Sequence, residues 1–188
     1  MLILRFAMRL IYMLVFRLSG WKIMGGPPKL KKFIIAVAPH SSNIDFLLGL
    51  AVRSIQRFDC SFMAKAELFK GPLGWLMKYL GGIPVYRNKS THAVDQIIAV
   101  AREREHFILA IAPEGTRKKV ERWKTGFYNM AYGAEIPLVF VAVDYPTKTI
   151  SWSAPLLPCG DIQKDAPEID QFFLGKRGKY HEAAKVMG

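Results

Sequence analysis

The sequence lacks most of the motifs that mark a covalent or metal-dependent enzyme. It has only two cysteines, Cys60 and Cys159, and they form neither a C-x-x-C pair nor a metal-ligand spacing. It has no G-x-S-x-G elbow, no cysteine beside a histidine and no glycine-rich phosphate loop. These absences argue against a serine or cysteine nucleophile and against a metal site, and the two thiols are expected to be reduced and unpaired.

Acidic residues are also scarce. Fifteen aspartates and glutamates face 27 lysines and arginines, which gives a formal net charge of +12. Such a charge favours an anionic partner, but it does not choose among nucleic acid, anionic lipid, a phosphorylated substrate and an acidic protein. With 188 residues, 51% of them hydrophobic, the chain is long and apolar enough for one domain with a real core.

The N-terminus is apolar but has no long uncharged run. A transmembrane helix needs about 20 apolar residues, whereas basic residues interrupt residues 1–24 so often that the longest inner uncharged run is 10–16. No small-residue cleavage site follows, as a signal peptide would require. On a helix, Arg5, Arg9 and Arg17 fall within an arc of roughly 120°, and the rest of the circumference is apolar.

This pattern is typical of a helix that lies in the membrane interface, with its arginines at the lipid phosphates. The alternative is an amphipathic helix packed on the domain itself. Gly25-Gly26-Pro27-Pro28 ends the segment. We therefore divide the chain into a membrane-interface segment, 1–24, and a catalytic domain, 29–188.

Buried strands alternate with helices along the rest of the chain. Continuous apolar runs predict strands at 33–38, 107–112 and 137–143, with further strands at 58–64 and 147–154. Helical spacing predicts helices at 43–56, 73–80, 93–105, 125–134 and 166–174, and places Trp75, Leu76 and Tyr79 in the core. The alternation predicts a single α/β domain with a mostly parallel central sheet covered by helices on both faces.

The turn after strand 33–38 carries a histidine and a carboxylate five residues apart, His40 and Asp45. On one helix such residues point about 140° apart. For them to meet, His40 must lie in the turn and Asp45 in the first turn of a helix that Asn43 can cap. Asp45 could then orient His40 as a general base. Taken alone, the pair fits a surface histidine beside an acid at a helix start better than it fits a catalytic pair.

A second unusual turn, 113–119, also follows a buried strand. In open α/β sheets, binding sites gather at the carboxyl ends of the strands, so both turns are expected at the same edge. Arg117, with Lys118 and Lys119, and Arg87 in another loop could bind phosphate oxygens. A base without a protein nucleophile would activate a hydroxyl of the substrate, or water, and the arginines suggest a phosphorylated alcohol.

Four ordered sequence blocks resemble the glycerophospholipid acyltransferase family, the 1-acylglycerol-3-phosphate acyltransferases. The first block is H-x4-D at 40–45 and the second is G-x4-R at 82–87. The third is E-G-T-R at 114–117, and the fourth is an apolar proline segment at 136–139. Together they cover roughly residues 33–143, and their order makes the resemblance far more specific than any single block.

The resemblance implies that His40, assisted by Asp45, deprotonates the free hydroxyl of 1-acylglycerol-3-phosphate. That hydroxyl would attack an acyl thioester of coenzyme A or acyl carrier protein directly and give phosphatidic acid. The resemblance further implies an acceptor pocket formed by Gly82, Arg87, Glu114, Gly115, Thr116 and Arg117. It implies no metal and no bound cofactor, and a peripheral or monotopic enzyme on the cytoplasmic face of an anionic membrane, whose basic surface could also dock acyl carrier protein.

The chain departs from the family pattern at four places. Pro39 precedes the histidine, Tyr86 precedes Arg87, Lys118 follows E-G-T-R, and the fourth block lacks a second proline. These departures leave open an acyltransferase for another lysolipid, such as lyso-ornithine or another aminolipid. A third reading is a non-catalytic basic module that binds membrane or nucleic acid. It explains the charge but neither the His40–Asp45 pair nor the E-G-T-R turn, so we expect no nucleic-acid partner.

Overall fold

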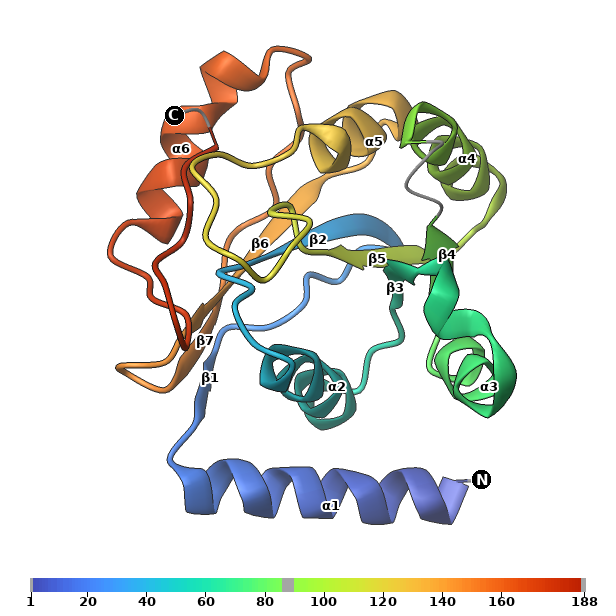
Figure 1. Cartoon of the computed structure of the whole chain (residues 1–188), viewed down its shortest axis with the longest axis vertical. Coiled ribbons are helices and arrows are strands. Elements are labelled where there is room, and N and C mark those ends of the chain that lie inside the picture. The colour runs from blue at the N-terminus through green and yellow to red at the C-terminus, as the bar shows by residue number, and fades with distance from the viewer. Residues whose placement is uncertain (1, 86–89, 187–188) are drawn as a thin grey trace.

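The computed structural model describes residues 2–85 and 90–186 of the chain. Its centre is a seven-stranded sheet of order β1-β7-β6-β2-β5-β3-β4 (Figure 1). The strands are β1 (Lys22–Met24), β2 (Lys32–Ala38), β3 (Ser61–Lys65), β4 (Gly82–Val85), β5 (Phe107–Ile111), β6 (Leu138–Asp144) and β7 (Thr149–Trp152). Strands β2 to β6 run parallel, and β7 is antiparallel to β6. The predicted mostly parallel sheet is confirmed.

Six α-helices of the described chain cover this sheet. They are α1 (Leu2–Ser19), α2 (Ile44–Gln56), α3 (Gly71–Tyr79), α4 (Ser90–Glu103), α5 (Gly126–Ala134) and α6 (Ile162–Phe173), with a short 3-10 helix, η1 (Ala66–Phe69), before α3. In Figure 1, α4, α5 and α6 lie on one side of the sheet, and α2 with α1 lies on the other. This is the predicted α/β architecture with helices on both faces.

Alternation along the central strands supplies both layers of the core. In β2, Ile34 and Ala36 face the side of α4, α5 and α6, whereas Phe33 and Ile35 face α2. Side chains of a strand point alternately to its two faces, so a strand buried on both sides must be apolar at every position. This is why 33–38 and 137–143 read as unbroken apolar runs.

Helix α1 contacts the domain along a narrow strip. Arg9 Nε donates a hydrogen bond to the carbonyl oxygen of Ile55 at the end of α2 (3.2 Å), and Phe16 is buried in the core beneath the sheet. On the opposite side of α1, Leu10, Leu14 and Leu18 are exposed. Within the described residues, no helix combines the length and the hydropathy needed to cross a membrane.

The predicted segment 1–24 is too long for one helical unit. The helix ends at Ser19, and Lys22–Met24 form β1, which pairs in parallel with β7 at the edge of the sheet. Lys22, the last basic residue of the predicted segment, therefore belongs to the sheet and not to the helix. Nor do all arginines face away from the domain, because Arg9 bonds to α2.

Helix α3 differs from expectation in its burial. Trp75 is 71% exposed and stacks on Tyr79 with ring centroids 5.7 Å apart, and Leu76 is also exposed. The prediction that these three residues belong to the core is wrong. The physical reason is position: α3 packs on η1 and on β4, the last strand of the sheet, and Met77 is the large side chain of α3 that is buried there.

Candidate active site

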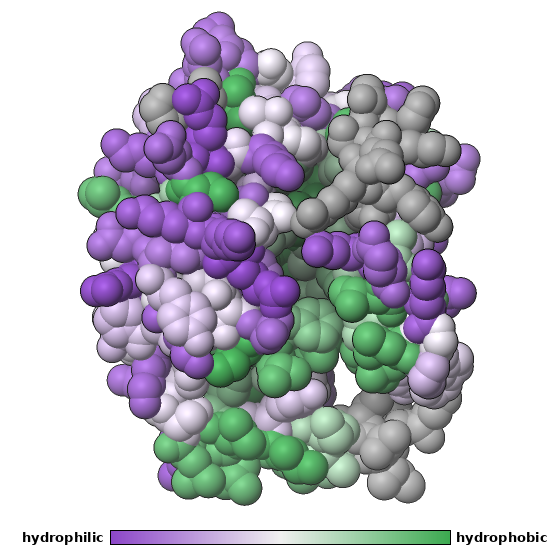
Figure 2. All heavy atoms as spheres, viewed as in Figure 1, coloured by the Kyte–Doolittle hydropathy of each residue, from purple (hydrophilic) through white to green (hydrophobic). Residues whose placement is uncertain are grey.

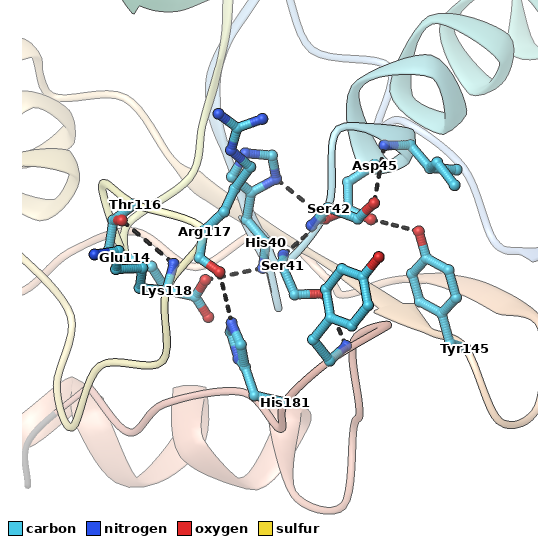
Figure 3. Close-up of polar contacts among 12 residues, drawn as sticks. His40, Ser41, Ser42, Asp45, Glu114, Thr116, Arg117, Lys118, Tyr145 and His181 are labelled. Atoms are coloured by element: carbon cyan, nitrogen blue, oxygen red, sulfur yellow. Dashed lines mark hydrogen bonds and ion pairs between the residues drawn. The ribbon is translucent and has the colours of Figure 1, made fainter.

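The two turns that follow β2 and β5 lie side by side, because β2 and β5 are parallel neighbours. His40 lies in the first turn, and Asp45 lies in the first turn of α2, as the spacing predicts. His40 Nδ1 is 3.3 Å from Asp45 Oδ2, and the imidazole is 26% exposed whereas the carboxylate is buried (Figure 3). Nδ1 facing a carboxylate carries the proton, which leaves Nε2 as the basic nitrogen.

Asp45 also organises the turn that carries His40. Its Oδ2 accepts hydrogen bonds from the backbone N–H groups of Ser41 and Ser42, both at 2.8 Å. Asn43 makes no side-chain cap at α2, so the predicted cap is wrong; instead Ser42 Oγ accepts a hydrogen bond from the N–H of Ile44. Ser42 thus binds the first N–H group of α2 in place of an asparagine cap, and Asp45 binds the turn that precedes the helix.

The environment keeps Asp45 ionised. Burial alone would raise its pKa, but contacts with His40, the hydroxyl of Tyr145 and the N–H groups of Ser42 and Ser41 together lower the pKa below its ordinary value. A charged carboxylate at this position fixes the tautomer of His40 and stabilises the imidazolium once a proton arrives. The pair can therefore act as a general base with an orienting acid.

Tyr145 is a site residue that sequence reasoning missed. Its hydroxyl donates a hydrogen bond to Asp45 Oδ1 at 2.6 Å, across 100 positions of the sequence. It follows directly after β6, which pairs with β2 on the side opposite β5. The signal that could have found it is this position: a polar side chain at the carboxyl end of a third parallel strand.

Glu114 lies beneath the turn that carries His40. It is 1% exposed, and its Oε2 accepts a hydrogen bond from the backbone N–H of His40 at 2.9 Å. Burial raises its pKa, although the hydrogen bond from His40 and the nearby imidazoles of His181 and His40 oppose that shift. Its Oε1 is buried without a hydrogen-bond partner among the described residues. The structure thus places Glu114 against the backbone of the turn.

The other residues of the E-G-T-R turn are partly or fully exposed next to the His40–Asp45 pair, which we call the dyad. Gly115 adopts a left-handed conformation (φ 64°), where a side chain would be strained and would crowd Lys124. Thr116 Oγ1 accepts a hydrogen bond from the N–H of Lys118. Arg117 is exposed on this turn, which Glu114 joins to the backbone of His40. Its guanidinium therefore belongs to the turn that neighbours the His40 turn.

The second block is placed differently. Gly82 begins β4, and three strand spacings of about 5 Å each separate β4 from β2 in the sheet. A Cβ at Gly82 would lie 2.8 Å from the carbonyl oxygen of Met77, so this glycine is required by packing against α3. It also lies at the strand end opposite the edge that carries the two turns. Arg87, the other predicted residue of this block, lies outside the described residues.

A C-terminal hairpin, residues 176–183, closes one side of the site. Within it, the N–H of Ala183 donates to the carbonyl oxygen of Lys176. The N–H of Tyr180 donates to Ser41 Oγ (3.4 Å), and His181 Nε2 lies 3.2 Å from the carbonyl oxygen of Arg117. The hairpin therefore joins the two turns, although its sequence gave no sign of this.

Other features of the site are simple. Cys60 and Cys159 are unpaired thiols, as expected. No group of three or more histidine, cysteine, aspartate or glutamate side chains in the described part of the chain could hold a metal ion. A cleft of about 690 Å³ is lined by α1, by the C-terminal half of α2 and by the end of α3. It lies at the other end of α2 from Asp45.

Fold and site together give an α/β domain in which a histidine, the buried carboxylate that faces it and an exposed arginine lie at the carboxyl edge of a parallel sheet. A family model described as Acyltransferase matches residues 26–144. This match spans well over half of the chain and contains both turns. The chain belongs to the acyltransferase family.

One solved structure with this fold is the 1-acyl-sn-glycerophosphate (LPA) acyltransferase PlsC from Thermotoga maritima. The match has a TM-score of 0.62 and 19% sequence identity, and it covers 89% of this chain and 77% of that chain. At this identity the likeness concerns the fold. No curated protein matches the chain.

Proposed function

We propose that the protein transfers an acyl chain from an acyl thioester to the free hydroxyl of 1-acylglycerol-3-phosphate and so makes phosphatidic acid. The observation that carries this proposal is the dyad: within an acyltransferase fold, His40 presents Nε2 outward while Asp45 holds Nδ1. The Thermotoga maritima protein with the same fold is a 1-acyl-sn-glycerophosphate (LPA) acyltransferase, which supports the same acceptor. The donor is an acyl thioester of coenzyme A or of acyl carrier protein.

The proposed reaction needs no covalent enzyme intermediate. His40 Nε2 takes the proton of the glycerol hydroxyl as its oxygen forms a bond to the thioester carbonyl carbon. The tetrahedral adduct then collapses, the carbon–sulfur bond breaks, and the thiolate receives the proton from the imidazolium. Asp45 stays ionised throughout and stabilises that cation.

Charge around the dyad supports a phosphorylated acceptor. Arg117 is exposed on the turn that Glu114 joins to the backbone of His40, and Lys118 and Lys119 follow it on the same exposed turn. A guanidinium binds two phosphate oxygens at once and so fixes orientation as well as charge. Glu114 supports this site indirectly by holding the N–H of His40.

A transfer assay with purified protein tests the proposal. Both donors are offered with lysophosphatidic acid and, separately, with an aminolipid that has a free hydroxyl but no phosphate. We expect transfer to lysophosphatidic acid, and a loss of roughly 1,000-fold in His40→Ala, since a general base contributes about 10²–10⁴-fold. His106→Ala, which removes a histidine that is 70% exposed immediately before β5, is the matched control and should keep full activity.

Two results would contradict this assignment. Near-normal turnover by His40→Ala would show that His40 is not the base. Transfer confined to the acceptor without phosphate would assign the enzyme to another lysolipid, and Arg117→Ala should then have little effect.

We further propose that the outward face of α1 places the enzyme on the cytoplasmic surface of an anionic membrane. Leu10, Leu14 and Leu18 share one exposed face of the helix, and Leu18 is 78% exposed. Figure 2 shows hydrophobic residues along the lower edge of the molecule, where α1 lies. A helix with so broad an apolar face suits the headgroup–acyl boundary. The exposed Trp75 and Tyr79 of α3 have the composition of an interfacial contact.

Co-sedimentation with vesicles tests the membrane assignment. The double variant Leu14→Glu/Leu18→Glu should lose most of its binding to vesicles that contain phosphatidylglycerol, because it places two charges in the apolar face. Leu174→Glu alters a residue of similar exposure just after α6 and should bind like the wild type. Equal binding by all three proteins would place the membrane contact elsewhere.

A further inference from the structure

Tyr145 completes the hydrogen bonding of the dyad carboxylate. Asp45 Oδ2 receives the N–H groups of Ser41 and Ser42 and faces His40, so this oxygen is fully used. Oδ1 receives the hydroxyl of Tyr145 at 2.6 Å. Both carboxylate oxygens are thus fixed, one by the catalytic turn and the other by β6.

The hydroxyl of Tyr145 is a permanent donor. Burial raises its pKa above the ordinary value, and the hydrogen bond and the charge of Asp45 raise it further. The group therefore donates its proton to Asp45 near neutral pH. The ionisable groups that face this pair are His40 from the turn and Tyr180 from the C-terminal hairpin.

The ring of Tyr145 is held by the segment that follows α1. The edge of Trp21 meets this ring at 88°, with centroids 5.1 Å apart. Trp21 in turn packs near Phe16 of α1, and the backbone N–H of Trp21 donates a hydrogen bond to the carbonyl oxygen of Phe16 at 3.0 Å. The end of α1 therefore reaches Asp45 through one aromatic contact and one hydrogen bond.

The same turn that carries Tyr145 also holds the end of α1. Lys148 Nζ donates to the carbonyl oxygen of Ser19 at 2.8 Å, and the N–H of Lys22 donates to the carbonyl oxygen of Lys148 at 2.9 Å. The N–H of Lys148 bonds to the carbonyl oxygen of Tyr145. Residues 145–148 thus join α1, β1 and the dyad in one continuous unit.

We propose that Tyr145 is a positioning residue of the dyad, seated by Trp21, so that the way α1 sits on the domain determines how firmly Asp45 orients His40. The inference rests on the proposed role of His40 as the base. Tyr145 donates into the protein and takes no part in the bonds that form or break. Its effect is on the orientation and charge of Asp45.

The chain contains a matched control for this hydrogen bond. Tyr128 donates its hydroxyl to Asp165 Oδ2 at 2.5 Å, and burial together with that bond raises its pKa in the same way. This pair joins α5 to α6 on the other side of the sheet. Tyr128→Phe and Tyr145→Phe each remove one hydroxyl from one carboxylate, and only the second is at the dyad.

Steady-state kinetics over a range of pH test the proposal. Tyr145→Phe should lower kcat on the order of 10-fold, the effect of one hydrogen bond to a charged group, with the KM values of donor and acceptor unchanged. The acid limb of its pH profile should move to higher pH, because a carboxylate that has lost this donor carries a less dispersed negative charge and stabilises the imidazolium of His40 more strongly. Trp21→Leu should change kcat and the acid limb in the same directions by a smaller amount, and Trp21→Phe should restore both.

A second readout does not depend on turnover. The side-chain nitrogen signals of His40, assigned by their loss in His40→Ala, should change in Tyr145→Phe and stay unchanged in Tyr128→Phe. If the wild type acylates none of the acceptors, the proposed function fails while this comparison still decides the role of Tyr145. Wild-type kinetics, pH profile and His40 signals in Tyr145→Phe would overturn the proposal, as would equal effects of the two tyrosine variants.

Discussion

Two buried carboxylates, Asp45 and Glu114, hold the same stretch of backbone in different ways. Asp45 lies at the start of α2 and receives the N–H groups of Ser41 and Ser42. Glu114 lies in the turn after β5 and accepts a hydrogen bond from the N–H of His40, the residue before Ser41. Three successive N–H groups of one turn are thus bound by two acids, one from the first turn of α2 and the other from the turn after β5.

The acids differ in how their remaining oxygen is satisfied. Asp45 Oδ1 accepts the hydroxyl of Tyr145, and the pKa of Asp45 is lowered in spite of burial. Glu114 Oε1 has no partner among the described residues, and burial raises the pKa of Glu114. Sequence motif alone therefore does not assign a role to an acid. Asp45 has the ionisation and contact that a histidine base needs, whereas Glu114 has the geometry of a brace.

Asp45→Asn should give the largest effect. The amide oxygen would stay at the position of Oδ2, because the N–H groups of Ser41 and Ser42 need an acceptor there, so the substitution removes the negative charge that stabilises the imidazolium of His40. We expect kcat to fall by at least about 100-fold, within the usual contribution of a general base, while the circular dichroism spectrum stays that of the wild type. If activity stayed within a few-fold of wild type, Asp45 would, like Glu114, only hold the backbone of the turn.

Glu114→Ala should give an intermediate effect that is mainly structural. It leaves the N–H of His40 buried without an acceptor, which costs about 1–3 kcal/mol of unfolding free energy. Urea denaturation measures this loss, and kcat should fall by much less than in Asp45→Asn. Glu114→Gln keeps an acceptor oxygen and should recover most of the stability. A Glu114→Ala protein that is stable but inactive would instead assign Glu114 to substrate or to chemistry.

The smallest effect should appear in the pH dependence of stability. Because the pKa of Glu114 is raised on folding, the unfolded chain loses its proton first as pH rises, so ionisation favours the unfolded state. The stability of the wild type should therefore decline, relative to Glu114→Gln, from the ordinary glutamate range near pH 4.3 up to the raised pKa, and then stay level.

Denaturation of both proteins between pH 4 and pH 8 provides the measurement. Asp45 acts with the opposite sign: its lowered pKa adds stability above its ordinary range, and this is lost as pH falls through the lowered value. A constant difference between wild type and Glu114→Gln across the whole range would show that Glu114 does not carry this penalty.

Much of the fold could be predicted from local patterns. The continuous apolar runs placed β2, β5 and β6, and helical spacing placed α2, α4 and α5 within a few residues. The meeting of His40 and Asp45 could also be predicted from local geometry, because the two residues lie only five positions apart, one in a turn and the other in the first turn of the next helix. Such features depend on neighbouring residues, which a sequence displays directly.

Contacts between distant segments could not be predicted in the same way. Tyr145 is 100 positions from Asp45, and nothing in its own neighbourhood indicates that partner. The burial of Trp75 and Tyr79 was predicted wrongly because helical spacing does not tell whether another layer covers the helix. Gly82 lies in a block of the expected spacing, but its conformation and its contact with Met77 are decided by the edge of the sheet.

The N–H groups of His40, Ser41 and Ser42 are all bound to carboxylates, and this has a consequence for the tetrahedral adduct of the proposed reaction. Many acyl-transfer enzymes stabilise the oxyanion with backbone N–H groups next to the catalytic residue. Here the N–H groups of His40, Ser41 and Ser42 all point to carboxylates and cannot also point to an oxyanion. The negative oxygen must therefore take its hydrogen bonds from outside this turn, and the neighbouring turn after β5, with the exposed Arg117, is a candidate source.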